Sequence, residues 1–307
     1  MDLKLVNVAD YIWKKLHENG VKHAFLLPGG GCMYLVDSLA RSKEISAVPL
    51  LHEQSVGIAA EAYAQYKNDL AVALVTTGPG STNAITACAA AWTDSTPIIF
   101  ISGQVKTSDS SKGTNLRQKG FQEIRIDEIV RAITKEVRSV RNAEDAQKAI
   151  VDLIRIAKSD RPGPVWLDVP LDIQSSPVEF INQSASVETS RIKNFYESSK
   201  IEELATQWSS CKRPMVLAGN GIRLSNSIKK LHQLIESTNT PCLLTWKAID
   251  YLDEEHPLNA GRPGTIAQRW ANLALQKSDF LLVIGARLDM GQIAYRIDTF
   301  ARNAKVF

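Results

Sequence analysis

Cysteine is scarce in this chain of 307 residues, and no two cysteines lie close enough in sequence to form a metal or redox motif. Zinc sites and thiol-redox centres usually place two cysteines within a few positions of each other. The spacing therefore predicts buried free thiols in a reducing cytoplasm. The histidines show no ligand spacing either, so we expect no metal held by this chain. The four cysteines are Cys32, Cys88, Cys211 and Cys242.

Long apolar runs and blocks of one charge are also missing. No stretch approaches the roughly 20 apolar residues that a membrane-spanning helix needs, and residues 1–20 mix acidic and basic side chains without the apolar centre of a signal peptide. The 36 basic and 33 acidic residues are spread along the chain and leave a formal charge of +3. No basic block is available to follow a phosphate backbone. We therefore expect a cytoplasmic protein that binds neither membranes nor nucleic acid.

Two alternating hydrophobic patterns are what the sequence does contain. Short continuous apolar runs, typical of strands buried on both faces, alternate with segments whose apolar residues recur at helical spacing. This order predicts an α/β fold with a doubly wound parallel sheet covered by helices on both faces. The strand-like runs lie at 21–27, 45–51, 70–77, 97–103 and 163–170, and the helical segments at 6–16, 55–66, 81–92 and 143–158.

A polar, serine-rich segment separates this first domain from a second one. We place the first domain at residues 1–175, a linker at 176–200 and a second α/β domain at 201–307. The chain stops inside an apolar piece that reads as a strand, an unusual place for a domain to finish. We therefore expect the second, Rossmann-like domain to be incomplete, either through truncation or because the chain is one component of a split enzyme.

The segment LLHEQSVGIAAEAYAQ, residues 50–65, places a histidine and a glutamate where an apolar run gives way to a helical pattern. A glutamate in the first turn of a helix has an ordinary explanation, because it interacts favourably with the helix dipole. Alternatively, the strand delivers Glu53 to the carboxyl edge of the sheet, where open α/β sheets bind ligands. His52 fits either direct chemistry or a core histidine bonded to backbone.

Glycine turns follow three of the predicted strands, and each permits backbone to approach a ligand closely. None contains the Gly-Lys-Ser/Thr of a phosphate-binding Walker loop, and none completes G-x-G-x-x-G. Taken singly, each is as readily a tight turn as a binding loop. The three turns are PGGG at 28–31, TTGPGSTN at 76–83 and SGQV at 102–105.

The order and spacing of these motifs resemble the pyrimidine-binding domain of thiamine diphosphate enzymes, most closely that of acetolactate synthase large subunits. LPGGG, HEQSVGIAAEAYA, VTTGPGSTN with the following STPIIFISGQV, KGFQEIRIDEI and RPGPVWLDVPLDI all occur in the family's order. The resemblance covers almost all of residues 1–180. It implies a transferase or lyase of branched-chain amino acid biosynthesis that uses thiamine diphosphate.

The resemblance gives Glu53 a catalytic role. In this family a carboxylate at pyrimidine N1′ drives the tautomerisation by which the cofactor's own amino group becomes the base. A short charge-assisted hydrogen bond in a dry pocket is the means. Aspartate would reach less far, and glutamine could not exchange the proton.

The resemblance also assigns the remaining site residues. Phe121 and Gln122 match the Phe-Gln with which acetolactate synthases hold a second 2-oxo acid, which favours carboligation over simple decarboxylation. Lys135 matches a lysine near the family's substrate entrance, although a solvated helix lysine fits equally well. The expected cofactor-binding residues are Pro28, Gly29 and Gly30 in the first turn, Glu53, and Thr77, Gly78, Pro79, Gly80 and Asn83 in the second.

The G-D-G motif with which the family's C-terminal domain holds Mg²⁺ and the diphosphate does not occur in this chain. We therefore expect the chain to be a poor catalyst alone and to act as a homodimer or homotetramer, with a possible partner chain that carries the missing domain. A non-catalytic subunit, or another 2-oxo acid decarboxylase or carboligase of the family, are the alternatives.

FAD is a further possible cofactor, because acetolactate synthases bind it in the central domain. Here Arg262 and Pro263 replace the Met-His commonly found in the flavin region. GNGIRLS, residues 219–225, is either a flavin turn or an ordinary strand-to-helix turn. Arg223 and Arg287 could face a flavin diphosphate or pair with carboxylates.

Overall fold

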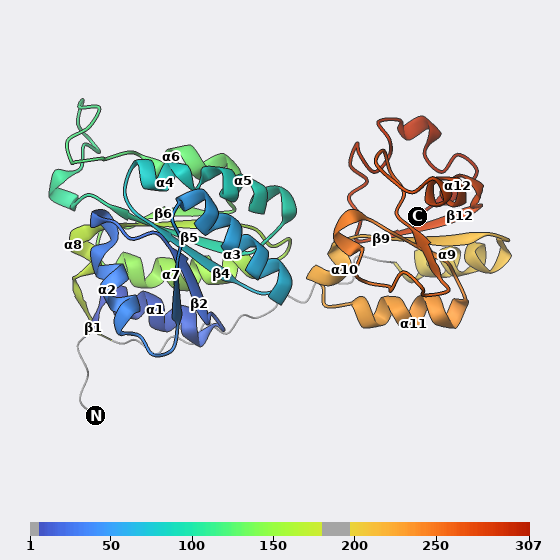
Figure 1. Ribbon diagram of the computed structural model, residues 1–307, viewed down its shortest axis with the longest axis horizontal. Helices are drawn as coiled ribbons and strands as arrows, with labels where there is room; N and C mark the ends of the chain where they lie inside the picture. The colour runs from blue at the N-terminus through green and yellow to red at the C-terminus, as the bar shows by residue number, and fades with distance from the viewer. Residues whose placement is uncertain (1–5, 180–196) are drawn as a thin grey trace. The chain divides into compact units, whose positions relative to one another are not determined.

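The computed structural model describes residues 6–179 and 197–307 and divides the chain into two compact units, Met1–Arg191 and Ile192–Phe307 (Figure 1). In the first unit, six strands form a parallel sheet in the order β3-β2-β4-β5-β7-β6. The prediction of a doubly wound parallel sheet is confirmed. The strands are β2 His23–Leu26, β3 Ser46–Pro49, β4 Ala71–Val75, β5 Ile98–Gln104, β6 Val137–Ser139 and β7 Val165–Pro170.

Helices cover both faces of this sheet, because alternate residues of each strand point to opposite sides. Leu74 and Ile101 belong to a core shared with α1 Val8–Glu18, α2 Met33–Arg41 and α7 Ala143–Lys158. Val75 and Phe100 belong to the opposite core, shared with α3 Glu53–Lys67, α5 Ile85–Asp94 and α6 Ile126–Ile129. The short helices α4 Pro79–Asn83 and α8 Leu171–Gln174 follow β4 and β7 directly. Figure 1 shows this three-layer arrangement in the first unit.

Two described elements fall inside the segment 176–200 that the sequence pattern predicts as linker. β8 Pro177–Val178 pairs antiparallel with β1 Val6–Asn7, which ties the end of the first unit back to its beginning. α9 Ser198–Ser210 begins before residue 200. The part of the predicted linker between these two elements, 180–196, lies outside the described residues.

The second unit contains a five-stranded parallel sheet in the order β11-β10-β9-β12-β13. One core lies between the sheet and α11, and a second core lies between the sheet and α12. This unit is therefore also a doubly wound α/β layer structure, as expected. Its elements are β9 Pro214–Ala218, α10 Gly221–Leu224, α11 Ile228–Thr238, β10 Cys242–Leu244, β11 Asn259–Gly261, α12 Arg269–Lys277, β12 Phe280–Ile284 and β13 Lys305–Val306.

Candidate functional site

The first sheet has a topological switch point at β2. The chain passes from β2 to its neighbour β3, then returns to pair β4 with the other edge of β2. The loops that leave β2 and β4 therefore lie side by side at the carboxyl edge, and β3 leads from the same edge into α3. Open α/β sheets bind ligands at such a reversal. Every cofactor-binding residue predicted from the sequence lies in one of these loops or at the start of α3 or within α4.

The glycine turn after β2 packs tightly against the threonines after β4. The Gly31 amide donates to Oγ1 of Thr76 at 3.0 Å. A Cβ on Gly29 would lie 2.5 Å from the Thr76 side chain, and one on Gly31 would lie 1.8 Å from Oγ1 of Thr77. A Cβ on Gly30, by contrast, would meet no atom within 4 Å. Close packing therefore requires glycine at positions 29 and 31, whereas Gly30 faces open space.

Glu53 begins α3 and is half-buried at the centre of this edge. Its Oε2 accepts a hydrogen bond of 2.9 Å from Nδ2 of Asn83, the last residue of α4. A Cβ on Gly80 would lie 3.2 Å from the other oxygen, Oε1, so only a glycine leaves that oxygen uncrowded. One carboxylate oxygen is thus oriented by an amide, and the other faces the glycine.

The segment that contains Phe121 and Gln122 reaches the site through its backbone. A Cβ on Gly78, which has a φ of 65°, would lie 2.2 Å from the carbonyl oxygen of Gln122. Gln122 itself has a φ of 60°, in the left-handed region. The Phe121 side chain is 84% exposed. The structure therefore joins this segment to the Gly78 turn and leaves the phenyl ring on the surface.

Two residues that the sequence did not single out hold the turn after β2. Thr76 accepts the Gly31 amide, and Gln174, fully buried at the end of α8, donates from Nε2 to the Gly31 carbonyl at 2.7 Å. Oγ1 of Thr77 and Oε1 of Gln174 are buried without a protein partner. Buried polar atoms of this kind usually bind an ordered water or a ligand. No local pattern marks Gln174, because it meets Gly31 only through the fold.

Asp168 forms a buried polar network behind the site. Its Oδ1 accepts from Oγ of Ser102 at 2.6 Å and its Oδ2 from Nε2 of Gln104 at 3.2 Å, while Ser102 accepts from the Trp166 indole at 2.9 Å. Burial raises the pKa of Asp168 to about 7, although these hydrogen bonds act in the opposite direction. The carboxyl group therefore changes its charge near neutral pH.

His52 and Lys135 have structural contacts that resolve the alternatives left open by the sequence. His52 is exposed and caps α3, its Nδ1 accepting from the Gln54 amide at 3.1 Å, so it is not a core histidine. Lys135 is half-buried and donates from Nζ to the carbonyl of Ser159 at 2.6 Å, beyond the last turn of α7. Burial lowers the pKa of its ammonium group. Lys135 is therefore partly buried against the end of α7 and does not itself lie on a helix.

The arginines that the sequence offers for a flavin diphosphate in the second unit both pair with carboxylates. Arg223 pairs with Asp250 and lies over the Tyr251 ring at 5.1 Å, and Arg287 pairs with Asp289 at 3.4 Å. Both arginines therefore have carboxylate partners. The glycines of GNGIRLS also serve internal packing, because a Cβ on Gly219 would lie 2.4 Å from the backbone at Ala286.

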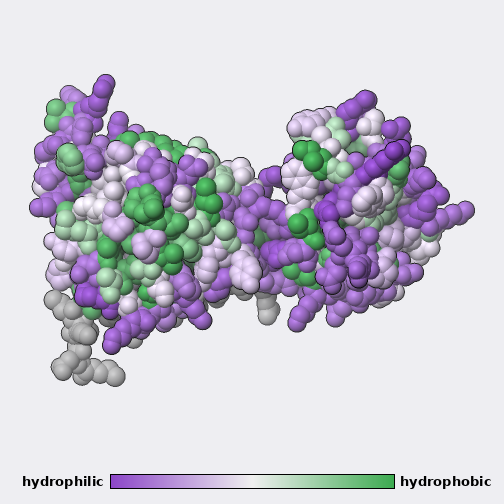
Figure 2. Space-filling model, in the orientation of Figure 1, coloured by the Kyte–Doolittle hydropathy of each residue, from purple (hydrophilic) through white to green (hydrophobic). Residues whose placement is uncertain are grey.

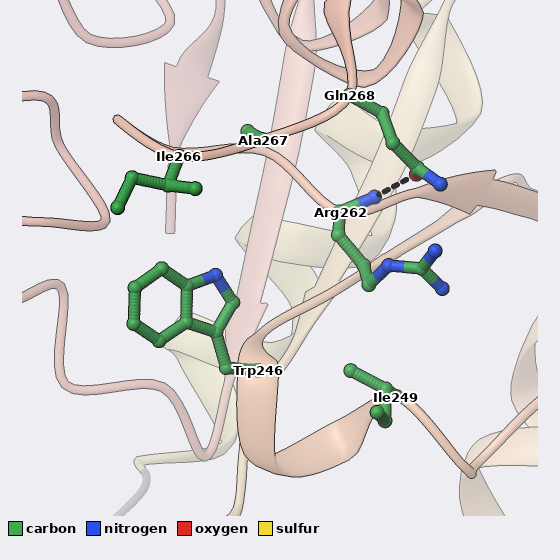
Figure 3. A pocket seen from close by; sticks show the side chains of 6 residues that line it. All are labelled: Trp246, Ile249, Arg262, Ile266, Ala267 and Gln268. Atoms are coloured by element: carbon green, nitrogen blue, oxygen red, sulfur yellow. Dashed lines mark hydrogen bonds between the residues drawn. The ribbon is translucent and has the colours of Figure 1, made fainter.

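A cavity of about 410 Å³ opens on the second unit (Figure 3). Figure 3 shows the Trp246 indole on one side and the Arg262 side chain on the other, with the Arg262 amide bonded to Oε1 of Gln268 at 2.9 Å. Ile249 and Ile266 complete an open, largely apolar lining. The cavity has no titratable group besides Arg262, so its residues offer binding rather than acid–base chemistry.

Over the described residues, no group of three or more histidine, cysteine or carboxylate side chains is arranged to hold a metal. In the same residues, no helix combines the length and the hydrophobicity needed to cross a bilayer.

Comparison with known protein families assigns both units. Residues 6–129 match the family described as thiamine pyrophosphate enzyme, N-terminal TPP binding domain. Residues 201–307 match thiamine pyrophosphate enzyme, central domain. The chain belongs to the thiamine pyrophosphate enzymes. The edge of the first sheet, with Glu53 at its centre, thus lies in the domain that binds thiamine pyrophosphate in this family.

Relatives of this thiamine pyrophosphate enzyme chain include acetolactate synthases from bacteria and a plant. The isozyme 1 large subunit of Escherichia coli (strain K12) is 36% identical over 97% of this chain and 51% of its own length. The large subunit of Corynebacterium glutamicum is 33% identical over 97% and 47%. Acetolactate synthase 1, chloroplastic, of Zea mays is 32% identical over 97% and 46%. The chain spans about half the length of these relatives.

Proposed function

We propose that this chain supplies the pyrimidine-binding part of an acetolactate synthase-like active site, which decarboxylates a 2-oxo acid such as pyruvate and joins the remainder to a second carbonyl compound. The observation that carries the proposal is the Glu53–Asn83 pair beside Gly80, at the switch point of a thiamine pyrophosphate-binding domain. Thiamine diphosphate, when bound, supplies a nucleophilic carbon that adds to the 2-oxo acid and stabilises the charge left when CO₂ departs.

Glu53 would hold a proton at pyrimidine N1′. A half-buried carboxylate can accept and return that proton. Because Asn83 donates to Oε2, Oε1 is the oxygen that would exchange the proton with the pyrimidine. A Cβ at position 80 would lie 3.2 Å from Oε1 and 2.6 Å from the Thr76 side chain, so glycine there keeps Oε1 uncrowded at the edge where the pyrimidine ring would bind. The buried, unpartnered hydroxyl of Thr77 and the open space at Gly30 also suit a polar ring and a reacting carbon at this edge.

The second carbonyl compound would lie against Phe121 and Gln122. The exposed phenyl ring and the amide offer one apolar and one hydrogen-bonding surface, a combination suited to a 2-oxo acid. This arrangement favours carboligation, because neither side chain can protonate the intermediate for release as an aldehyde.

The diphosphate and Mg²⁺ would be held by another domain, in this or in a further chain. The described residues present no cluster of metal ligands, and the relatives are about twice as long as this chain. We therefore propose that these 307 residues alone turn over little or no pyruvate, so measurable turnover by the isolated chain would argue against this division of the site. No step is assigned to a flavin.

A second copy of the chain is the proposed partner of the face formed by α3 and α5. Ile58 and Tyr66 of α3 are 46% and 91% exposed, and Trp92 of α5 is 42% exposed. Figure 2 shows hydrophobic residues gathered on part of the first unit's surface. Large exposed apolar groups of this kind are typical of interfaces, so we propose a homodimer or homotetramer in the cytoplasm.

Isothermal titration of the enzyme assembled from every domain that it needs, with thiamine diphosphate and Mg²⁺, tests the proposal by comparing wild type with Glu53→Gln. We expect the substitution to weaken binding by about tenfold, because a charge-assisted hydrogen bond is lost. Glu44→Gln removes an exposed glutamate from the same unit and should leave binding unchanged. Equal binding by Glu53→Gln and wild type would remove Glu53 from the site.

Product analysis with the enzyme assembled from every domain that it needs tests the reaction. Acetolactate from pyruvate supports the proposal. Acetaldehyde or acetoin in its place would instead identify a decarboxylase or a different carboligase of the family. Copurification of an inactive complex, with no product from any 2-oxo acid, would indicate a non-catalytic component.

A further inference from the structure

The loop between β5 and α6, residues 105–125, contains Phe121 and Gln122 but has few apolar anchors of its own. Leu116 and Phe121, in the middle and near the end of the loop, are 59% and 84% exposed, while Ile124 at its end packs partly against the core. Figure 1 shows the middle of this loop extending away from the body of the first unit. Hydrophobic burial therefore anchors the end of the loop at Ile124, and polar contacts have to determine the conformation of the rest.

Donors from two parts of this loop form hydrogen bonds with the carboxylate of Glu123. Its Oε1 accepts from the amide of Ser111 at 2.6 Å and from the hydroxyls of Ser111 and Ser110 at 2.9 and 3.2 Å. Its Oε2 accepts from the amides of Lys119 and Gly120 at 2.8 and 3.2 Å. Burial is the largest single influence and raises the pKa of Glu123, but these donors together outweigh it and lower the pKa to about 2. The carboxylate is therefore charged at neutral pH and binds both limbs of the loop.

Gln104 ties the base of the same loop to the sheet. Its Nε2 donates to the Ile124 carbonyl at 3.0 Å and to buried Asp168 at 3.2 Å, and its Oε1 accepts from the Val105 amide at 3.0 Å. One side-chain amide thus holds the first residue of the loop, Val105, and its last residue but one, Ile124. Glu123 lies directly before the second of these anchors.

Gln122 lies between these anchors in a conformation that needs support. A φ of 60° in a residue other than glycine costs on the order of 1 kcal/mol and persists where the surroundings over-determine it. Its carbonyl oxygen lies over Gly78, a contact that excludes any side chain at position 78. The neighbouring carboxylate of Glu123 is the group that can impose this conformation.

We propose that Glu123 is a positioning residue, which holds Phe121 and Gln122 against the Gly78 turn and thereby sets which second carbonyl compound the site accepts. This inference rests on the function proposed above. The hydrogen bonds that the described residues give Glu123 lie within its own loop, whereas Glu53 begins α3 and Asn83 ends α4, so Glu123 acts through the loop and not on the donor substrate.

The variant Glu123→Gln distinguishes a role of Glu123 in holding the loop from a direct role in the reaction of the donor substrate. A glutamine offers one acceptor oxygen, so it loses either the Ser111 side or the Lys119 and Gly120 side of the carboxylate's contacts. Hydrogen exchange in the loop should become about tenfold faster or more at the amides of Ser111, Lys119 and Gly120. Glu128→Gln is the matched control, because Glu128 is exposed and forms a surface ion pair with Arg125 at 3.3 Å. In Glu128→Gln, the amides of residues 105–125 should exchange hydrogen at the wild-type rate.

The functional readout is a competition between two acceptor 2-oxo acids that differ by one methylene, with the complete enzyme. In Glu123→Gln the product ratio should shift by about threefold or more, while CO₂ release from the donor alone changes by less than about twofold. Unchanged exchange, an unchanged product ratio, or a parallel fall of both activities would overturn the proposal. If wild type converts no 2-oxo acid, the proposed function fails, and the exchange rates still decide whether Glu123 holds the loop.

Discussion

Asn83 donates a hydrogen bond of 2.9 Å to one carboxylate oxygen of Glu53, across 30 residues of sequence. The contact joins the last residue of α4 to the first residue of α3, two helices that follow different strands of the same sheet. Because each helix begins at the carboxyl edge of this sheet, the pair forms there. The geometry of the carboxylate therefore depends on both helices.

Asn83→Ala should weaken thiamine diphosphate binding without unfolding the first unit. Asn83 is exposed, so the expected loss is about 1 kcal/mol, or roughly fivefold in the dissociation constant. Isothermal titration measures it. Thr82→Ala is the control, because the Thr82 hydroxyl bonds only the Pro79 carbonyl within α4. A loss of equal size in both variants would mean that α4 itself, and not the Asn83 amide, supports binding.

Gly30→Ala and Gly31→Ala should separate ligand approach from packing. A Cβ on Gly31 would overlap the buried side chain of Thr77, so this variant should lose about 1 to 3 kcal/mol of unfolding free energy. A Cβ on Gly30 meets open space, so that variant should keep its stability and lose cofactor affinity or turnover. Urea unfolding together with titration checks both. A destabilised Gly30→Ala would show that the turn is more crowded than this geometry indicates.

The unfolding free energy should depend on pH through Asp168. Its pKa is about 7 in the folded protein, above the ordinary value of 3.8, because burial disfavours the charged form. The folded state then binds this proton more tightly than the unfolded state, so the contribution of Asp168 falls as pH rises from about 4 to 7. The nearby carboxylate of Asp127 acts in the same direction.

Asp168→Asn should remove that part of the pH dependence, whatever its effect on stability at a single pH. Urea unfolding at pH 5, 6, 7 and 8 measures the slope. Asp152→Asn, an exposed change on α7, should keep the slope of wild type. Identical slopes in wild type and Asp168→Asn would assign the pH dependence to other groups.

Lys135→Met should lower stability and leave cofactor binding unchanged. The substitution removes the ammonium group that bonds the carbonyls of Ile156 and Ser159 at the end of α7, an expected cost of about 1 to 2 kcal/mol. Lys148→Met on the same helix removes an exposed lysine paired with Glu144 and should cost less than about 0.5 kcal/mol. A role at a substrate entrance would instead appear as a change in binding or turnover with little change in stability.

Much of the fold follows from local pattern, since strands buried on both faces require continuous apolar runs. The strands at 71–75 and 165–170 lie within predicted runs, the strand at 98–104 is displaced by one residue from the predicted 97–103, and α7 occupies the predicted 143–158. The pattern did not predict α2 or β6. α2 begins after a glycine turn with no side-chain cap, and β6 has only three residues, so neither gives a strong local signal.

The positions of Glu53 and of the glycine turns could be predicted because each directly follows a strand. The sequence could not show why each position needs a glycine. Gly29 and Gly31 are crowded by threonines that lie more than 40 residues away in sequence, while Gly30 is not crowded. Gln174 has no local signature, because the fold brings its partner Gly31 near it. Glu123 bonds groups at both ends of its own loop, and that arrangement depends on how the loop folds.

The sequence by itself determined the α/β layers, the family and the carboxylate at the sheet edge, because hydrophobic period and motif order are local properties of the chain. Only the tertiary structure decided which oxygen of Glu53 is oriented, that Lys135 closes a helix end, and that Arg223 and Arg287 have carboxylate partners. Those outcomes depend on distances between segments far apart in sequence, and such distances exist only once the sheets have formed.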